Sequence, residues 1–257
     1  TAVRSSNRLI SALTQTFGFF LWGHWHSTVG AVKFLFGQDK GWNKSRLVTP
    51  KQPLTYRLKR AVDLIVCSTA LICLSPLFPI IALAIKIDSS GPILFSQLRI
   101  GCAFPTHTEI FKMFKFRSMG TDAEQDGKPV WATEQDPRVT RVGKFLRKTR
   151  LDELPQLLNV IRGDMSLIGP RPERPGFYQD LENAIPFFAE RTFWIRPGIT
   201  GLAQVTQGYT ETVEQARTKA LFDHAYALKT HNLGDWLRTD SKIVLDTFLV
   251  MALGRGR

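Results

Sequence analysis

The chain has 257 residues, 44% of them hydrophobic and 22% charged, which excludes a disordered tail or a collagen-like fibre and leaves room for one large domain or two small ones. Its cysteines are odd in number and two of the three lie in an apolar run, so a disulfide scaffold is excluded and a reduced, cytoplasm-facing protein is indicated. The net charge of +12 indicates an anionic partner, either nucleic acid, acidic lipid or a phosphorylated substrate.

Positive charge is concentrated in the first 60 residues, which hold ten Lys or Arg, eight Phe or Trp and a single acidic residue, Asp39. Basic and aromatic residues together are typical of a segment that lies on an anionic bilayer, where each basic residue contributes about 1 kcal/mol. A nucleic-acid binder uses similar residues, but no zinc-finger, helix-turn-helix or RNA-binding aromatic motif accompanies them. We therefore expect residues 1–55 to form a basic interfacial segment, with no nucleic-acid partner.

Residues 64–85 form an apolar run of 22 residues without a charge, which exceeds the roughly 18 residues that indicate a membrane helix. A buried core helix is the alternative. In the middle of the run, Pro76 removes a backbone donor and frees the carbonyl four residues back, so we expect a bend there. The hydroxyl of Ser75 is a local donor for that carbonyl.

Basic residues flank this run on both sides, and such residues mark the cytoplasmic face of a membrane. A straight span would put one basic end on the wrong face, whereas a helix bent at Ser75-Pro76 enters and leaves by the same face. The sequence therefore predicts a re-entrant helix hairpin over residues 56–88. The flanking residues are Arg57, Lys59, Arg60 and Lys86.

From residue 89 onward the chain has the pattern of a cytoplasmic domain. Residues 93–95 and the alternating stretch 111–117 predict a small β-hairpin, and the polar residues 121–137 predict a loop. Helical periodicity predicts the remaining elements. These are helices over 139–148, 155–162, 176–181, 211–229 and 236–253, with Gly163 ending the second and a rigid, non-helical segment at 169–172.

Asp152 and Glu153 are the strongest candidates for catalysis. Pro155 is tolerated only in the first turn of a helix, so we expect both acids at a helix N-terminus. There the helix dipole keeps carboxylates ionised and attracts phosphate, and an ionised aspartate is a competent nucleophile toward phosphorus. Adjacent acids diverge by about 100° around a helix, so one would attack while the other steers a metal ion or a proton. Ordinary helix capping is the alternative for a bare Asp-Glu pair.

Basic residues bracket this acidic pair. A carboxylate that attacks a diphosphate needs positive charge to relieve repulsion between the anions, and Arg offers planar bidentate donors to phosphate. A Mg²⁺ ion that bridges phosphate to a carboxylate would supply the remainder. The basic candidates are Lys115 and Arg117 in the predicted strand, Arg141, Lys144, Arg147, Lys148 and Arg150 before the pair, and Arg171 between Pro170 and Pro172.

Motifs of several other enzyme classes are missing from the sequence. It contains no Walker-type phosphate loop and no Gly-x-Gly-x-x-Gly, which argues against an ATP- or NAD-dependent enzyme. No zinc-ligand spacing, serine elbow or Cys-His arrangement stands out.

The motifs from about Tyr56 to the C-terminus resemble those of the bacterial sugar transferases, the monotopic polyprenyl-phosphate phosphoglycosyl transferases. They follow the family's order along some four-fifths of the chain. The matching segments are Lys59-Arg60-Ala61-Val62-Asp63, Ser75-Pro76, Lys115-Phe116-Arg117-Ser118-Met119, Leu151-Asp152-Glu153-Leu154-Pro155-Gln156, Gly163-Asp164-Met165-Ser166, Gly169-Pro170-Arg171-Pro172, Arg196-Pro197-Gly198-Ile199-Thr200-Gly201 and Leu253-Gly254-Arg255-Gly256.

The resemblance implies a mechanism in which Asp152 attacks the β-phosphate of a nucleotide diphosphate sugar and releases the nucleoside monophosphate. A polyprenyl phosphate then takes the phosphosugar from the enzyme. It implies Mg²⁺ as the cofactor, with Asp152 near the metal and Glu153 assisting. It also implies substrate- and phosphate-binding roles for Lys115, Arg117, Arg147, Pro170, Arg171, Pro172 and Arg196.

We therefore predict a predominantly helical α+β fold in a monotopic membrane protein, divided into residues 1–55, 56–88 and a catalytic domain at 89–257. We expect it to start a lipid-linked glycan, such as an exopolysaccharide, at the bacterial inner membrane with its catalytic domain on the cytoplasmic face. Anionic membrane lipid is an expected partner, and the helix over 236–253 is a candidate surface for a homo-oligomer. The alternative is a non-catalytic membrane scaffold of a polysaccharide-assembly complex.

Overall fold

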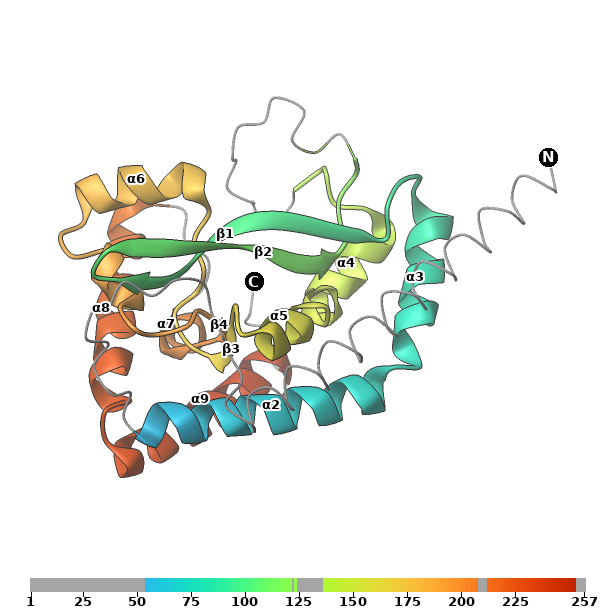
Figure 1. The fold of residues 1–257 in the computed structure, drawn as a ribbon. Coiled ribbons are helices and arrows are strands. Elements are labelled where there is room, and N and C mark those ends of the chain that lie inside the picture. The colour runs from blue at the N-terminus through green and yellow to red at the C-terminus, as the bar shows by residue number, and fades with distance from the viewer. Residues whose placement is uncertain (1–53, 122, 124–135, 208–211, 253–257) are drawn as a thin grey trace, which may run out of the picture.

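The computed structural model describes residues 54–121, 123, 136–207 and 212–252. The predicted interfacial segment 1–55 lies almost wholly outside these ranges, as do most of the predicted loop 121–137, the start of the predicted helix 211–229 and the motif at 253–256. In the described ranges the protein is mostly helical with small two-stranded sheets, as the sequence predicts (Figure 1).

The uncharged run forms the bent helix pair α2 (Leu54–Leu74) and α3 (Leu77–Asp88), whose axes differ by 63°. The break falls at Ser75-Pro76, as predicted. The carbonyl that Pro76 leaves free is that of Ile72, and the Ser75 hydroxyl donates to it at 2.8 Å. No single described helix is long and apolar enough to cross a bilayer, whereas α2 and α3 together pass that test by length and composition.

Charged side chains of α2 fasten this helix to the rest of the protein. Arg60 donates to two carbonyls in the last turn of α5 (Gln156–Arg162), at 2.5 and 2.9 Å, where the helix dipole favours a cation. Asp63 is only 3% exposed and accepts from the backbone N–H of Leu167 at 3.1 Å. The position of α2 is therefore set by directed bonds as well as by apolar packing.

The strands β1 (Leu94–Phe104) and β2 (His107–Phe116) form the predicted antiparallel hairpin. It is longer than predicted, because the second half of β1 does not alternate in polarity: its residues 100–103 are all buried. The buried amide of Asn159 joins α5 to β2, accepting from the Phe114 N–H at 2.9 Å and donating to the Lys112 carbonyl at 2.7 Å. These bonds hold the middle of α5 beside β2.

A second, parallel pair of strands joins segments about 30 residues apart, β3 (Ser166–Ile168) and β4 (Gly198–Thr200). The chains cross so closely that a Cβ at Gly198 would overlap the backbone nitrogen of Gly169. Glycine is therefore required at this crossing. The strands are three residues each, too short to give a periodic pattern, and they were not predicted.

The remaining helices confirm the later predictions with shifted ends. They are α4 (Arg141–Lys148), α6 (Pro175–Ala184), α8 (Val213–Lys229) and α9 (Leu233–Ala252), together with the unpredicted short helix α7 (Leu202–Thr206). The largest apolar core lies between α2, α3, β2, α4 and α5, and a separate one joins α6 to α8. Figure 1 shows α2 and α9 along one side of the protein and the hairpin on the opposite side.

Candidate active site

Asp152 and Glu153 lie in a turn of 3₁₀-helix (Leu151–Glu153) between α4 and α5. The predicted position at a helix start is corrected in detail: α5 begins only at Gln156, and Pro155 caps it. Arg150, immediately before the 3₁₀ turn, adopts a left-handed conformation with φ 58°. A non-glycine residue in this region is strained, and such strain often accompanies function.

The carboxylate of Glu153 is fully engaged by cations. Its Oε1 accepts from Lys115 Nζ at 2.8 Å, and its Oε2 lies 3.8 Å from an Arg150 guanidinium nitrogen. Burial by itself would raise the pKa of Glu153, but Lys115 first, then Arg150 and Arg171, lower it to about 2. Glu153 therefore carries a constant negative charge at physiological pH.

Asp152 is in a different environment although it is the next residue. It is 6% exposed, and its Oδ1 is buried without a hydrogen-bond partner among the described residues. Burial raises its pKa to about 6, and the neighbouring charge of Glu153 adds to this, while Lys115, Arg150 and Arg147 oppose it. Burial therefore outweighs the nearby cations in setting this pKa, and the carboxylate is still mostly ionised at neutral pH.

An orphaned buried carboxylate oxygen is costly, by about 1–3 kcal/mol or more. A raised pKa and an unsatisfied oxygen together mark a functional group. Two of the predicted phosphate-binding residues, Lys115 and Arg147, lie close enough to act on Asp152 electrostatically. The structure thus brings Asp152 together with Glu153, Lys115 and Arg147, four of the residues that the sequence predicted for the active site.

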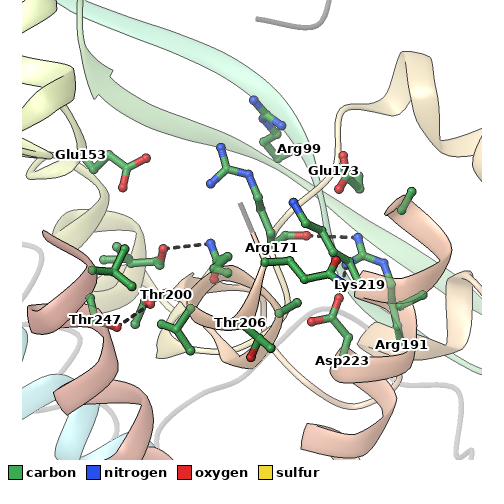
Figure 2. A pocket seen from close by; sticks show the side chains of 18 of the residues that line it. Arg99, Glu153, Arg171, Glu173, Arg191, Thr200, Thr206, Lys219, Asp223 and Thr247 are labelled. Atoms are coloured by element: carbon green, nitrogen blue, oxygen red, sulfur yellow. Dashed lines mark hydrogen bonds and ion pairs between the residues drawn. The ribbon is translucent and has the colours of Figure 1, made fainter. Parts of the chain in front are cut away.

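Beside this turn is a cavity of about 680 Å³, within the size range of small-molecule sites. Glu153 lines the cavity, whereas the adjacent Asp152 is not among its lining residues. Figure 2 shows Arg99, Arg171 and Lys219 extending into the same space, opposite Glu153. The charged residues that line the cavity are Arg99, Arg150, Glu153, Arg171, Glu173, Arg174, Arg191, Lys219 and Asp223.

The predicted rigid segment 169–172 carries Arg171 over this cavity. The four consecutive carbonyls of residues 170–173 each accept a hydrogen bond, and the donors come from three separate parts of the chain, which fixes the conformation of this backbone. The pairs are Gly198 N to the Pro170 carbonyl at 2.8 Å, Arg191 to Arg171 at 3.1 Å, Arg99 to Pro172 at 3.1 Å and Ile100 N to Glu173 at 2.9 Å. Pro170 and Pro172 thus act by holding Arg171 in place.

Two predicted phosphate-binding residues lie elsewhere. Arg117 is 5% exposed, and its guanidinium donates to the carbonyls of Ser89 and Ser90 in the turn after α3. Arg196 lies at the other end of α5, where a Cβ on Gly163 would be 3.8 Å from its guanidinium. Neither lines the cavity, and neither is among the charges that act most strongly on Asp152.

Sequence reasoning missed six charged residues of the cavity, which are Arg99, Glu173, Arg174, Arg191, Lys219 and Asp223. Arg191 donates to Asp223 at 2.8 Å, and both side chains are nearly fully buried. Lys219 and Asp223 are four residues apart on α8, which places them on one face of that helix. That spacing was visible in the sequence, but nothing there showed that this face meets Arg171.

Comparison with known proteins agrees with this architecture. Residues 54–254 match the family model for bacterial sugar transferases. The matched range contains the bent helix pair, the Asp152 turn and the residues that line the cavity. The chain is 42% identical over 204 residues to the UDP-N-acetylgalactosamine-undecaprenyl-phosphate N-acetylgalactosaminephosphotransferase of Aeromonas hydrophila, covering 79% of this chain and 46% of that protein. The chain thus spans about half the length of that relative.

Two further relatives have similar identity and different lengths. The UDP-glucose:undecaprenyl-phosphate glucose-1-phosphate transferase of Klebsiella pneumoniae is 42% identical over 180 residues, which is 69% of this chain and 37% of that protein. The exopolysaccharide production protein PSS of Rhizobium leguminosarum bv. phaseoli is 39% identical over 206 residues, or 78% of this chain and 97% of that protein. With a family match over residues 54–254, the chain belongs to the bacterial sugar transferase family.

Proposed function

We propose that this protein transfers a phosphosugar from a nucleotide diphosphate sugar, a UDP-sugar, to polyprenyl phosphate and thereby starts a lipid-linked glycan. The observation that carries the proposal is the buried Asp152, whose Oδ1 has no partner in the described structure and whose neighbours are Lys115, Arg147 and Arg150. The names of the relatives supply the two substrate classes, since they act on UDP-sugars and undecaprenyl phosphate.

In the proposed first step, a carboxylate oxygen of Asp152 forms a bond to the β-phosphorus of the donor. The bond from that phosphorus to the oxygen bridging the α-phosphate breaks, and the nucleoside monophosphate leaves with the electron pair. Lys115 and Arg147 offset the repulsion between the carboxylate and the phosphate. In the second step, a phosphate oxygen of the polyprenyl phosphate attacks the same phosphorus and frees Asp152.

Glu153 has a supporting part in this mechanism. Its ion pair holds Lys115 beside Asp152, and its negative charge helps to keep the pKa of Asp152 near 6. A carboxylate with a pKa just below the working pH is ionised and yet more nucleophilic than an ordinary one. The pair thus divides the work, one residue attacking and the other tuning it.

Mg²⁺ is part of the proposal. Among the described residues no group of three or more His, Cys, Asp or Glu could hold a metal ion. Mg²⁺ in phosphoryl-transfer sites is commonly bound by only one or two carboxylates, with phosphate oxygens and water completing its shell, and the unpartnered Oδ1 of Asp152 suits that role. When bound, the ion would neutralise phosphate charge.

We also propose that the protein sits on the bacterial inner membrane, with its catalytic domain on the cytoplasmic face. Large apolar side chains are exposed along α2, α3 and α9, and such patches on a folded protein indicate a binding surface. They are Leu54, Val62, Ile65, Ile72, Ile80 and Ile87 on the bent pair, and Leu237, Leu245, Phe248 and Leu249 on α9. A lipid-borne phosphate lies at headgroup depth, where such a protein could reach it.

The test is incubation of the protein, in lipid nanodiscs, with a panel of UDP-sugars, undecaprenyl phosphate and Mg²⁺. The proposal predicts release of UMP and formation of an undecaprenyl-diphosphate sugar with at least one donor. Release of UDP would contradict it, because that product requires cleavage at the sugar rather than at the β-phosphorus. A preparation carrying Asp152→Asn is the control for contaminating enzymes.

A further inference from the structure

The face of α8 that meets the cavity carries charged residues with no part in the mechanism above. Lys219 is partly buried there, and Asp223 lies one turn further along the same face. Both belong to the end of the cavity away from Glu153 (Figure 2). This end is therefore built by a helix that is distant in sequence from the Asp152 turn.

The negative charge of Asp223 is paired with the Arg191 guanidinium. It accepts from Arg191 at 2.8 Å, and Arg191 in turn donates to the backbone carbonyl of Arg171 at 3.1 Å. Removing either partner of such a buried pair leaves an uncompensated charge, so the pair is a fixed structural unit. Arg191 and Asp223 are positioning residues: they fix the backbone of Arg171.

Lys219 lines a cavity whose charged residues are six Lys or Arg and three Asp or Glu. The charges that act on it are Arg171, which repels it, and Glu173 and Asp223, which attract it; burial and Arg171 outweigh these and lower its pKa to about 8. Arg99, from the hairpin, experiences the same repulsion from Arg171, and burial lowers its pKa to about 10. Several cations close together in a partly buried cavity repel one another, and a bound anion relieves that repulsion. Such a cluster is therefore expected at an anion-binding site.

Arg171 lies between the two ends of the cavity. Its charge acts on Glu153 at one end and on Lys219 at the other. A diphosphate bound with its β-phosphorus at Asp152 places its α-phosphate one phosphate unit away. The α-phosphate would then lie in the cavity beside the acidic pair, on the side of Arg171 and α8.

We propose that Lys219, together with Arg171, binds the α-phosphate of the donor, the phosphate that departs on the nucleoside monophosphate. The inference rests on the proposed function and adds a residue that neither the motifs nor the relatives' names assign. As the bond to the β-phosphorus breaks, negative charge builds on the departing phosphate, and the Lys219 ammonium stabilises it. No proton transfer is required, since the departing phosphate oxygen is a stable anion.

Equilibrium titration of the full-length protein with UDP, ADP and GDP tests this binding without turnover. Lys219→Met is expected to weaken binding of the preferred nucleoside diphosphate tenfold or more, and Lys219→Arg to retain it within about threefold. Lys229→Met is the matched control, because it removes the same charge from an exposed position in the last turn of α8. Unchanged affinity in Lys219→Met, or an equal loss in Lys229→Met, would overturn the assignment.

Steady-state kinetics separates the subsite from general damage. Lys219→Met is expected to raise KM for the UDP-sugar and the inhibition constant of UMP by a similar factor, with KM for polyprenyl phosphate unchanged. An increase in both KM values would show damage to the fold and overturn the proposal. If the protein binds a nucleoside diphosphate but transfers no phosphosugar, the proposed function is contradicted, while the effect of Lys219→Met on binding still tests the subsite. If the unaltered protein binds no nucleoside diphosphate, the proposed function and the Lys219 subsite are both overturned.

Discussion

Lys115 donates to Glu153 at 2.8 Å, whereas the orphaned Oδ1 of the adjacent Asp152 has no partner among the described residues. The two acids therefore differ in chemistry: Glu153 is a permanent anion, and Asp152 is a buried carboxyl group with a raised pKa. This difference is the basis of the proposed mechanism, because the acid without a firm ion pair is the one available to attack phosphorus.

Asp152→Asn should abolish transfer and make the protein more stable at pH 7.5. The folded-state pKa of Asp152 is raised above its ordinary value, so the folded protein binds the proton more tightly and stability falls as pH rises from about 4 to 6. Above that range the ionised carboxylate costs roughly 1–3 kcal/mol, which the neutral amide avoids. Denaturant unfolding and UMP release measure the two effects.

The same substitution separates the enzyme from the scaffold alternative. A non-catalytic scaffold predicts that a strain carrying Asp152→Asn still assembles its polysaccharide. Complementation by this variant to wild-type levels would therefore contradict the proposed role of Asp152, and its greater stability excludes misfolding as the reason for any failure.

The Lys115–Glu153 pair should show strong coupling. Lys115→Met removes the shorter of the two ion pairs of a buried carboxylate and should destabilise the protein by about 2–3 kcal/mol. Adding Glu153→Gln should restore most of that stability but no activity, because the cation beside Asp152 is still missing. Lys112→Met, at an exposed position on the same strand, is the control and should change neither property. Additive losses in the double variant would show that the pair is not an energetic unit.

The pH dependence of donor kcat/KM should report Asp152. Activity should decline with unit slope below about pH 6, since the protonated carboxyl group cannot attack. Glu153→Gln removes the neighbouring negative charge that raises this pKa, so the acid limb should move to lower pH. If the acid limb of the kcat/KM profile lies at the same pH in Glu153→Gln as in the unaltered protein, a group other than Asp152 controls that limb.

The bent helix pair should expose both of its ends on one side of the membrane. Single cysteines at the exposed positions Arg57 and Ser90, in a protein with Cys73→Ser, should both react with a membrane-impermeant maleimide in inside-out vesicles. Neither should react in intact spheroplasts. Reaction of the two positions from opposite sides would establish a straight span and refute the re-entrant arrangement.

Local chemistry made much of this structure predictable. The bend could be placed at Ser75-Pro76 because proline frees one known carbonyl, that of Ile72, and the neighbouring hydroxyl is the nearest donor. Likewise, Gly163 ends α5 with a φ of +96°, a conformation that favours glycine. Both features depend on residues within one helical turn, so a single sequence contains the information.

What could not be predicted depends on distant contacts. The sequence places Arg117 in the same strand as Lys115, yet their side chains go to different partners, because the turn at Ser89 and Ser90 offers carbonyls to Arg117. The cavity also depends on α8 packing against a segment some 50 residues earlier, so no local pattern could show that Lys219 meets Arg171. The raised pKa of Asp152 has the same origin, since it follows from burial rather than from its place in the turn.

The most direct test of the central claim is to mix the protein with the active UDP-sugar and Mg²⁺ in the absence of polyprenyl phosphate, quench at once, and measure the mass of the intact protein and its peptides. The account predicts one equivalent of UMP and a mass increase of one phosphosugar located on Asp152, which disappears when polyprenyl phosphate is added. Transfer that proceeds with no adduct at any time, or an adduct on a residue other than Asp152, would contradict it.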